Sequence, residues 1–171
     1  MDLRKLVRQL LGSRYILVDF EGAKAVLMPL VKRLTPHYQR LFEQAYLSRD
    51  GRRRLKDSEY FHLSVLRALL KGLMGEDERK ALKACCRDVA DWTFGSSVYA
   101  SELSEALFGD PHHHRLYALL GKARRGELDL PLPQRDGRLL VWTREAAEKW
   151  RAFVLEESNE PDPEKGDTAS P

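Results

Sequence analysis

A cluster of cationic and imidazole side chains between residues 112 and 138 is the part of this sequence best suited to binding a charged partner. Its members are His112, His113, His114, Arg115, Lys122, Arg124, Arg125, Arg135 and Arg138. Guanidinium and ammonium groups bind phosphate oxygens, and an arginine can read a guanine base edge through two hydrogen bonds. Such contacts require the side chains to share a surface, so the elements that carry them decide the interpretation.

Two helices joined by a tight turn are predicted around this cluster. Apolar residues recur at helical spacing on both sides of the turn: Leu103, Ala106 and Leu107 before it, Leu116, Leu119 and Leu120 after it. Gly109 and Asp110 suit the turn and a helix cap, and Pro111 suits the first position of the second helix. His112 to Arg115 then lie at the amino-terminal end of that helix, which is where helix-turn-helix proteins contact bases.

The segment that follows Gly126 predicts a two-stranded hairpin. Residues 128–132 would form the first strand, although two prolines confine it to a sheet edge. Residues 134–138 contain the Asp-Gly pair typical of a hairpin turn, and residues 139–142 return as the second strand. Arg135 and Arg138 would flank the tip, where their charge meets phosphate or the minor groove.

A final helix is predicted to open on Trp142 and to carry Trp150 eight residues later. We expect these two indole rings to pack that helix onto the hairpin. The resulting order is helix, turn, basic helix, hairpin and helix. This order is typical of a winged helix-turn-helix that binds duplex DNA.

Residues from about Tyr99 to Phe153 resemble the excisionase-like winged helices of phages and mobile elements, which are related to the MerR-type DNA-binding domain. The resemblance rests on SELSEALFG, on HRLYALLGKARRGEL, on the proline-containing hairpin and on the W-TREAAEK-W spacing. It implies that Arg115 and the neighbouring histidines approach bases. It also implies that Lys122, Arg124, Arg125, Arg135 and Arg138 contact the DNA backbone. The sequence departs from the family at His112 to His114, where members usually carry small hydroxyl residues.

The preceding residues, 1–93, predict a separate helical domain. Apolar periodicity favours helices over 2–11, over a segment that begins at Thr35-Pro36, over 58–73 and over 77–92. For residues 15–30 the pattern fits either a small hairpin, which we favour, or a helix broken at Pro29. We assign this domain to oligomerisation or partner binding.

The fold class is therefore mainly α, with an N-terminal helical domain followed by a small winged helix with a two-stranded wing. The small residues around Gly95 place the boundary so that the domains are 1–93 and 94–155. Residues 156–171 are acidic, contain proline and are almost free of large apolar side chains, so we expect a disordered tail.

Charge is distributed unevenly although the net charge is only +3. Residues 1–56 contain 13 basic and 5 acidic residues, whereas residues 94–154 are close to neutral. Within the front half, Arg49, Arg52, Arg53 and Arg54 form a basic loop. This loop is either an ordinary solvated charge run or a second phosphate-binding surface.

Catalytic or metal-binding residues are not predicted. Asp19 and Glu21 are the one carboxylate pair that suggests a nuclease, and no third acid or lysine stands at a recognisable spacing beside them. Consecutive histidines on a helix point about 100° apart and do not converge on one ion. Cys85 and Cys86, placed in a helix, are poorly oriented to bridge each other and are expected to be one core thiol and one partly exposed thiol.

These observations predict a non-enzymatic bacterial or phage protein without cofactors whose partner is double-stranded DNA. Its role would be transcription regulation or an accessory function in recombination or for a mobile element. The absence of a signal peptide and of an apolar spanning run favours a cytoplasmic, nucleoid-associated protein with no membrane partner. The first alternative is a protein-interaction adaptor in a replication or packaging assembly, and the second is the metal-dependent nuclease.

Overall fold

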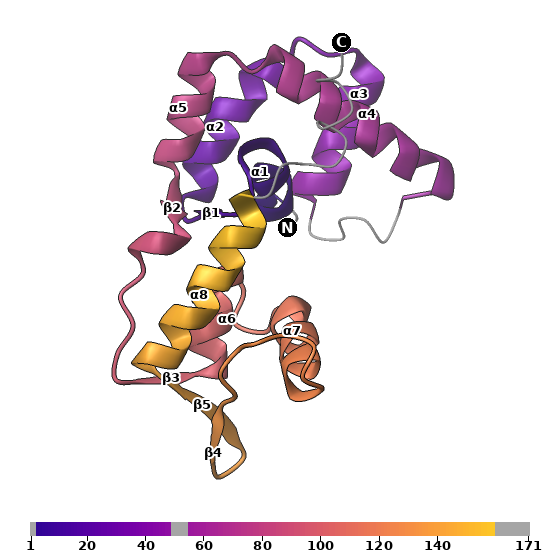
Figure 1. Ribbon diagram of the computed structural model, residues 1–171. Coiled ribbons are helices and arrows are strands. Elements are labelled where there is room, and N and C mark those ends of the chain that lie inside the picture. Colours follow the sequence, from indigo (N-terminus) through magenta and orange to yellow (C-terminus); the bar gives the residue numbers. More distant parts are fainter. Residues whose placement is uncertain (1–2, 49–54, 160–171) are drawn as a thin grey trace, which may run out of the picture. The chain divides into compact units, whose positions relative to one another are not determined.

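The part of the chain that the structure describes is mainly helical and contains two small antiparallel sheets. The structure is a computed structural model, and it describes residues 3–48 and 55–159 (Figure 1). The chain forms two compact units, and the boundary between them lies between Asp88 and Val89. The sequence predicted this boundary between residues 93 and 94. No helix in these described ranges is both long enough and apolar enough to cross a membrane.

The first unit, Met1–Asp88, consists of helices and two strands. In chain order it contains α1 (Leu3–Leu11), β1 (Tyr15–Leu17), α2 (Phe20–Val31), α3 (Pro36–Phe42), a π-helical turn η1 (Glu43–Leu47), α4 (Asp57–Leu73), α5 (Glu76–Ala84) and β2 (Cys86–Asp88). The predicted amphipathic first helix is confirmed, because its apolar stripe is buried while Arg4 and Lys5 are exposed.

A single core holds this unit together. It draws side chains from α1, α2, α4 and α5 and includes the fully buried rings of Phe42 and Tyr46. Each fully buried leucine or phenylalanine contributes roughly 1.5–3 kcal/mol relative to an exposed one. The helices are therefore stabilised mainly by this shared interior, since several are too short to persist alone in water.

The favoured hairpin over residues 15–30 is wrong. Only Tyr15–Leu17 is a strand, and it pairs antiparallel with Cys86–Asp88, with Ile16 opposite Arg87. The second apolar run belongs to helix α2, which begins after Asp19 and continues past Pro29 to Val31. Pro29 lies in the last turn, so the missing N–H removes one hydrogen bond without ending the helix at that residue.

The predicted helix over 77–92 is too long, because α5 ends at Ala84 and the next residues join β1. An ion pair of 2.7 Å between Arg14 and Asp88 fastens the end of this small sheet. Cys85 is buried and Cys86 is half-buried, and both are free thiols, as expected. Burial, followed by the neighbouring Cys85, raises the pKa of the Cys86 thiol to about 11.

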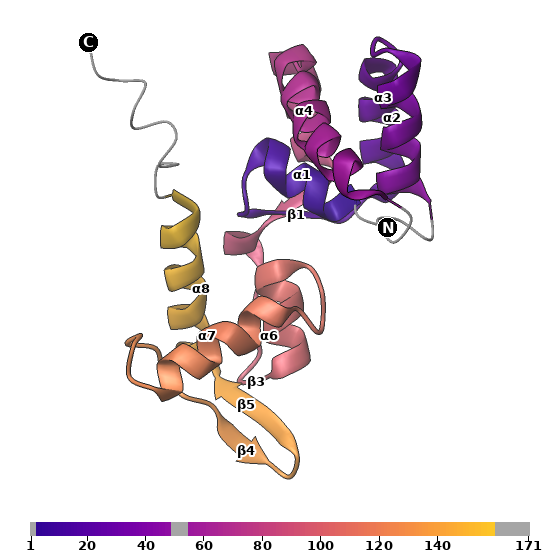
Figure 2. The ribbon, with the colours of Figure 1, turned by 90° about the vertical axis from the view of Figure 1, so that its right-hand side faces the viewer.

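The second unit, Val89–Pro171, combines helices with a three-stranded sheet. Its elements are a 3-10 turn η3 (Val89–Asp91), β3 (Ser97–Tyr99), α6 (Ala100–Phe108), α7 (His114–Arg124), β4 (Gln134–Asp136), β5 (Leu139–Thr143) and α8 (Arg144–Asn159). Figures 1 and 2 both show the β4 and β5 hairpin projecting beyond the helices of this unit.

The predicted two-stranded wing differs from the observed sheet in two ways. The sheet has the order β3-β5-β4, and its first hairpin strand is Gln134–Asp136 rather than residues 128–132. Pro131 and Pro133 have no N–H to donate to a ladder, whereas each residue of β4 has one. The third strand is Ser97–Tyr99, and it places Val98 opposite Trp142. No local sequence pattern predicts this pairing.

Trp142 lies in strand β5, so the last helix begins at Arg144 and not at Trp142. Thr143 starts α8, because its hydroxyl oxygen accepts a hydrogen bond of 3.1 Å from the Ala146 N–H. The helix continues to Asn159, so residues 156–159 of the expected disordered tail are helical. The rest of that tail, residues 160–171, lies outside the described residues.

Asp19 serves the fold as the amino-terminal cap of α2, because its Oδ1 accepts a hydrogen bond of 3.0 Å from the Gly22 N–H. We expect Asp19→Ala to lower the free energy of unfolding by about 1 kcal/mol, since an uncapped helix leaves that N–H unpaired. Asp19→Asn keeps the acceptor and should change stability by less than about 0.5 kcal/mol. Chemical denaturation of both variants measures the difference, and equal losses would show that the cap is not the stabilising contact.

Candidate nucleic-acid interface

A buried serine organises the turn between α6 and α7. The Ser104 hydroxyl donates to the Asp110 carbonyl oxygen at 2.5 Å and accepts from the His113 N–H at 2.9 Å. Gly109 ends α6 with a left-handed backbone, φ +79°, which favours glycine. The side chain of Asp110 then accepts from the His112 N–H at 2.8 Å. The turn is therefore held by polar contacts at each of its residues from 109 to 113 except Pro111.

The predicted start of the second helix at Pro111 is wrong. Pro111 and His112 form a turn, and α7 begins at His114 with His113 as its cap. The His113 Nδ1 accepts a hydrogen bond of 3.2 Å from the Arg115 N–H. Asp110 accepts its hydrogen bond within the turn and does not cap the helix, because α7 begins four residues later.

The three histidines consequently have different environments. His113 is half-buried and its ring stacks on that of Phe108 at 5.0 Å, while the His114 ring stacks on that of His113 at 4.4 Å. His112 and His114 are both exposed. His113 therefore supports the helix start, and His112 and His114 are the two that can present their rings to a partner.

A stripe of partly or fully exposed residues runs along α7. It consists of His114, Tyr117, Ala118, Lys122 and Arg125, which follow helical spacing opposite the buried Leu116, Leu119, Leu120 and Ala123. The middle of this face carries only the small residues Ala118 and Gly121, so a partner can approach the helix backbone closely there. Tyr117, which is 47% exposed, was missed by the sequence reasoning. Its spacing of three residues from His114 was the available signal.

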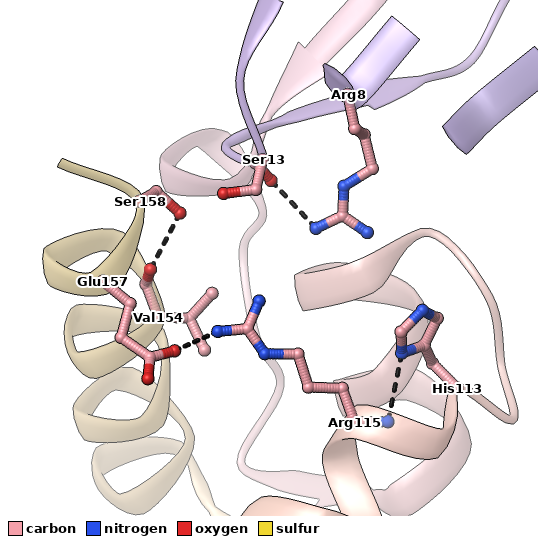
Figure 3. Close-up of polar contacts among 7 residues, drawn as sticks. All are labelled: Arg8, Ser13, His113, Arg115, Val154, Glu157 and Ser158. Carbon is pink, nitrogen blue, oxygen red and sulfur yellow. Dashed lines mark hydrogen bonds and ion pairs between the residues drawn. The ribbon is translucent and has the colours of Figure 1, made fainter. Parts of the chain in front are cut away.

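Arg115 points away from this stripe toward α8. Its guanidinium forms an ion pair with the Glu157 carboxylate and lies over the Phe108 ring, 5.7 Å from its centre. Figure 3 shows the side chain directed at Glu157, beside the helix start that His113 caps. The residue predicted to approach bases is thus engaged by an acid of its own unit.

At the other end of α7, the cations differ in their partners. Lys122 and Arg124 are both exposed, whereas Arg125 pairs with Glu127 at 3.0 Å. The hydrogen bond and charge of Arg125 lower the pKa of the Glu127 carboxyl. This pair is solvent-exposed and therefore weak, so Arg125 can exchange Glu127 for another anion at little cost.

The two-residue turn of the hairpin is Gly137-Arg138, between Asp136 of β4 and Leu139 of β5. Arg138 lies in this turn and Arg135 lies in β4, and both are exposed. Gly137 has φ +62°, which the tight turn requires. The Tyr99 hydroxyl donates to the Asp136 Oδ2 at 2.9 Å, and this hydrogen bond and the charge of Asp136 raise the pKa of Tyr99. The contact joins β3 to the hairpin tip and keeps Asp136 beside the tyrosine.

The other residues that the sequence singled out lie outside the described residues or belong to the first unit. Arg49, Arg52, Arg53 and Arg54, the basic loop of the first half, lie outside the described residues. Asp19 and Glu21 lie at the start of α2 in the other unit. Within the described ranges, no three His, Cys, Asp or Glu side chains gather closely enough to hold a metal ion.

Comparison of the chain with protein-family models, with curated proteins and with solved structures found no match.

Ser104→Ala should lower the free energy of unfolding by about 1–3 kcal/mol, because it removes one buried hydroxyl and leaves the His113 N–H and the Asp110 carbonyl without that partner. Ser101→Ala on the same helix is the matched control, since Ser101 is exposed and should change stability by less than about 0.5 kcal/mol. Denaturant unfolding followed by tryptophan fluorescence measures both, and an equal effect at the two serines would contradict the role given to Ser104.

Proposed function

We propose that the second unit is a winged helix that binds double-stranded DNA, with α7 entering a groove and the β4 and β5 hairpin contacting the backbone beside it. The outer stripe of α7 carries this proposal. This stripe is mainly polar and cationic, and its middle carries only small side chains. A tight turn and a buried apolar face hold the helix in place. The major groove of DNA is wide enough to admit an α-helix, and a polar, cationic face can contact the base edges and phosphates there.

The roles of individual residues follow from their exposure. His114, Tyr117 and Lys122 would contact bases or the groove walls from the stripe, and His112 would lie at its entrance. Arg124, Arg135 and Arg138 are exposed cations suited to phosphate. Arg115 would act only after it leaves Glu157. We place the protein among transcription regulators and accessory factors of recombination or mobile elements, acting at the nucleoid without catalysis.

The adaptor is the second candidate, because a specific observation favours it. The same unit exposes Leu132 and Leu139 to 53% and 59%, in addition to Tyr117, and apolar side chains of this size suit a protein partner. Salt separates the two functions. Release of counterions from DNA makes log affinity fall linearly with log salt, whereas an apolar docking surface shows no such slope.

The double variant Arg135→Gln, Arg138→Gln should weaken binding to duplexes of every sequence and reduce the magnitude of the salt slope by about 2, because each phosphate contact contributes roughly one. The double variant Lys80→Gln, Lys24→Gln, on helices of the other unit, removes the same charge and should leave the slope unchanged. Fluorescence anisotropy of labelled duplexes selected from a random pool measures the slopes, and a wild-type slope near zero would favour the adaptor.

Replacing Glu157 should release Arg115 and strengthen DNA binding. We expect Glu157→Gln to bind selected duplexes several-fold more tightly at low salt, and the gain should disappear when Arg115→Ala is added. Glu156→Gln is the matched control, because Glu156 is exposed on the same helix and its replacement removes the same charge. Equal gains from the two glutamates would mean that net charge alone acts, and that Arg115 takes no part.

A further inference from the structure

The outer face of α4, in the first unit, is apolar although it is exposed. Phe61 is 69% exposed and Leu69 is 39% exposed, while Leu63, Leu66 and Leu70 fill the core from the opposite face. The outer stripe Phe61, Val65, Ala68 and Gly72 has steps of four, three and four residues, which is the seam spacing of paired helices. This face therefore has the pattern of a helix that packs against another helix.

Beside the carboxyl-terminal half of this stripe lies an apolar groove of about 440 Å³. Its walls come from the end of α2, the start of α3 and the end of α4: Arg33, Leu34, Thr35, Tyr38, Ala68, Leu69, Gly72 and Leu73. A side chain added at Gly72 would meet nothing within 4 Å, so the groove is open at this residue. The groove has room for a large apolar side chain.

We propose that α4 packs antiparallel against α4 of a second copy of this chain, and that Phe61 of each copy occupies the groove of the other. A two-fold axis between the levels of Val65 and Ala68 sets Phe61 opposite Gly72 and Val65 opposite Ala68. Large side chains then face small ones along the whole seam. Both the protruding ring and the groove lie on one surface, as an isologous dimer requires.

Charge favours the same arrangement. The end of α4 that bears Phe61 carries the exposed Asp57, whereas the other end carries the exposed Lys71, and Arg33 lines the groove. Antiparallel packing brings the acidic end of each copy to the basic end of the other, twice in the dimer. Asp57 and Lys71 are fourteen residues apart on one helix, about 21 Å, so they pair only between copies.

The chain offers no occupant of its own from the segments outside the described residues. Residues 49–54 (RDGRRR) and 160–171 (EPDPEKGDTASP) contain no large apolar side chain. Phe61 is the most exposed of the large hydrophobic side chains in residues 3–48 and 55–159. This proposal does not depend on DNA binding. A dimer would contain two copies of the second unit.

Sedimentation velocity of the full chain, over protein concentrations from nanomolar to about 0.1 mM, tests the dimer. We expect a monomer–dimer equilibrium that Phe61→Ser and Gly72→Phe each weaken at least tenfold. Gly72→Phe fills the groove, and it should not lower the melting temperature, because glycine is a poor helix residue and the space is open. Val18→Ser, at an apolar residue that is 56% exposed elsewhere in the unit, should leave the equilibrium unchanged.

A charge exchange tests the antiparallel arrangement. Asp57→Lys and Lys71→Glu should each weaken the dimer, because each single change brings like charges together across the seam. The double variant should restore the dimer, since the exchanged charges are again opposite in sign between the two copies. A wild-type chain that remains monomeric throughout would overturn the proposal. So would a dimer that withstands Gly72→Phe, or single charge variants that the double variant does not rescue.

Discussion

The edge-to-face pair of Trp142 and Trp150 determines the arrangement of the second unit. Both rings are fully buried with centres 5.6 Å apart, and they join strand β5 to helix α8. The Trp150 Nε1 also donates to the Pro131 carbonyl at 2.8 Å, which fastens the segment between α7 and the hairpin. Buried indole rings combine large apolar area with one polar atom that needs a partner. The direction in which the hairpin leaves the helices follows from these contacts.

The same helix α8 connects the core to the electrostatics of the proposed interface. One face buries Ala147, Trp150 and Val154, and the next turn carries Glu157 to Arg115. Arg151 donates to the Trp92 carbonyl and lies over Phe94, so the helix also fixes the start of the unit. Because packing sets the position of α8, it also sets which cation of α7 is neutralised. The unit is nearly neutral overall, but its acids form ion pairs with some cations and leave other cations exposed.

Much of the helical framework could be predicted because its signal is local. The stripe of α1, the face of α4 and the two helices on either side of Gly109 follow from apolar spacing within each helix. The strands could not be predicted in this way. Tyr15–Leu17 and Ser97–Tyr99 are three residues long, and their partners are Cys86–Asp88 and residues 141–143, far along the chain. Their register follows from packing, since such short pairs are not stable alone.

The sequence alone identified the residue types of the candidate interface. It also predicted that they gather on one helix and on the hairpin tip. Helical periodicity and the Asp-Gly pair, which indicates a hairpin, suffice for that, because both act between near neighbours. Only the tertiary structure decided which groups are available. His113 became a cap because Ser104 and Asp110 delay the helix start, and Arg115 turned to an acid 42 residues away. Sequence by itself determined the charges; burial and distant partners, which depend on how α6, α7 and α8 pack, determined which of them face outward.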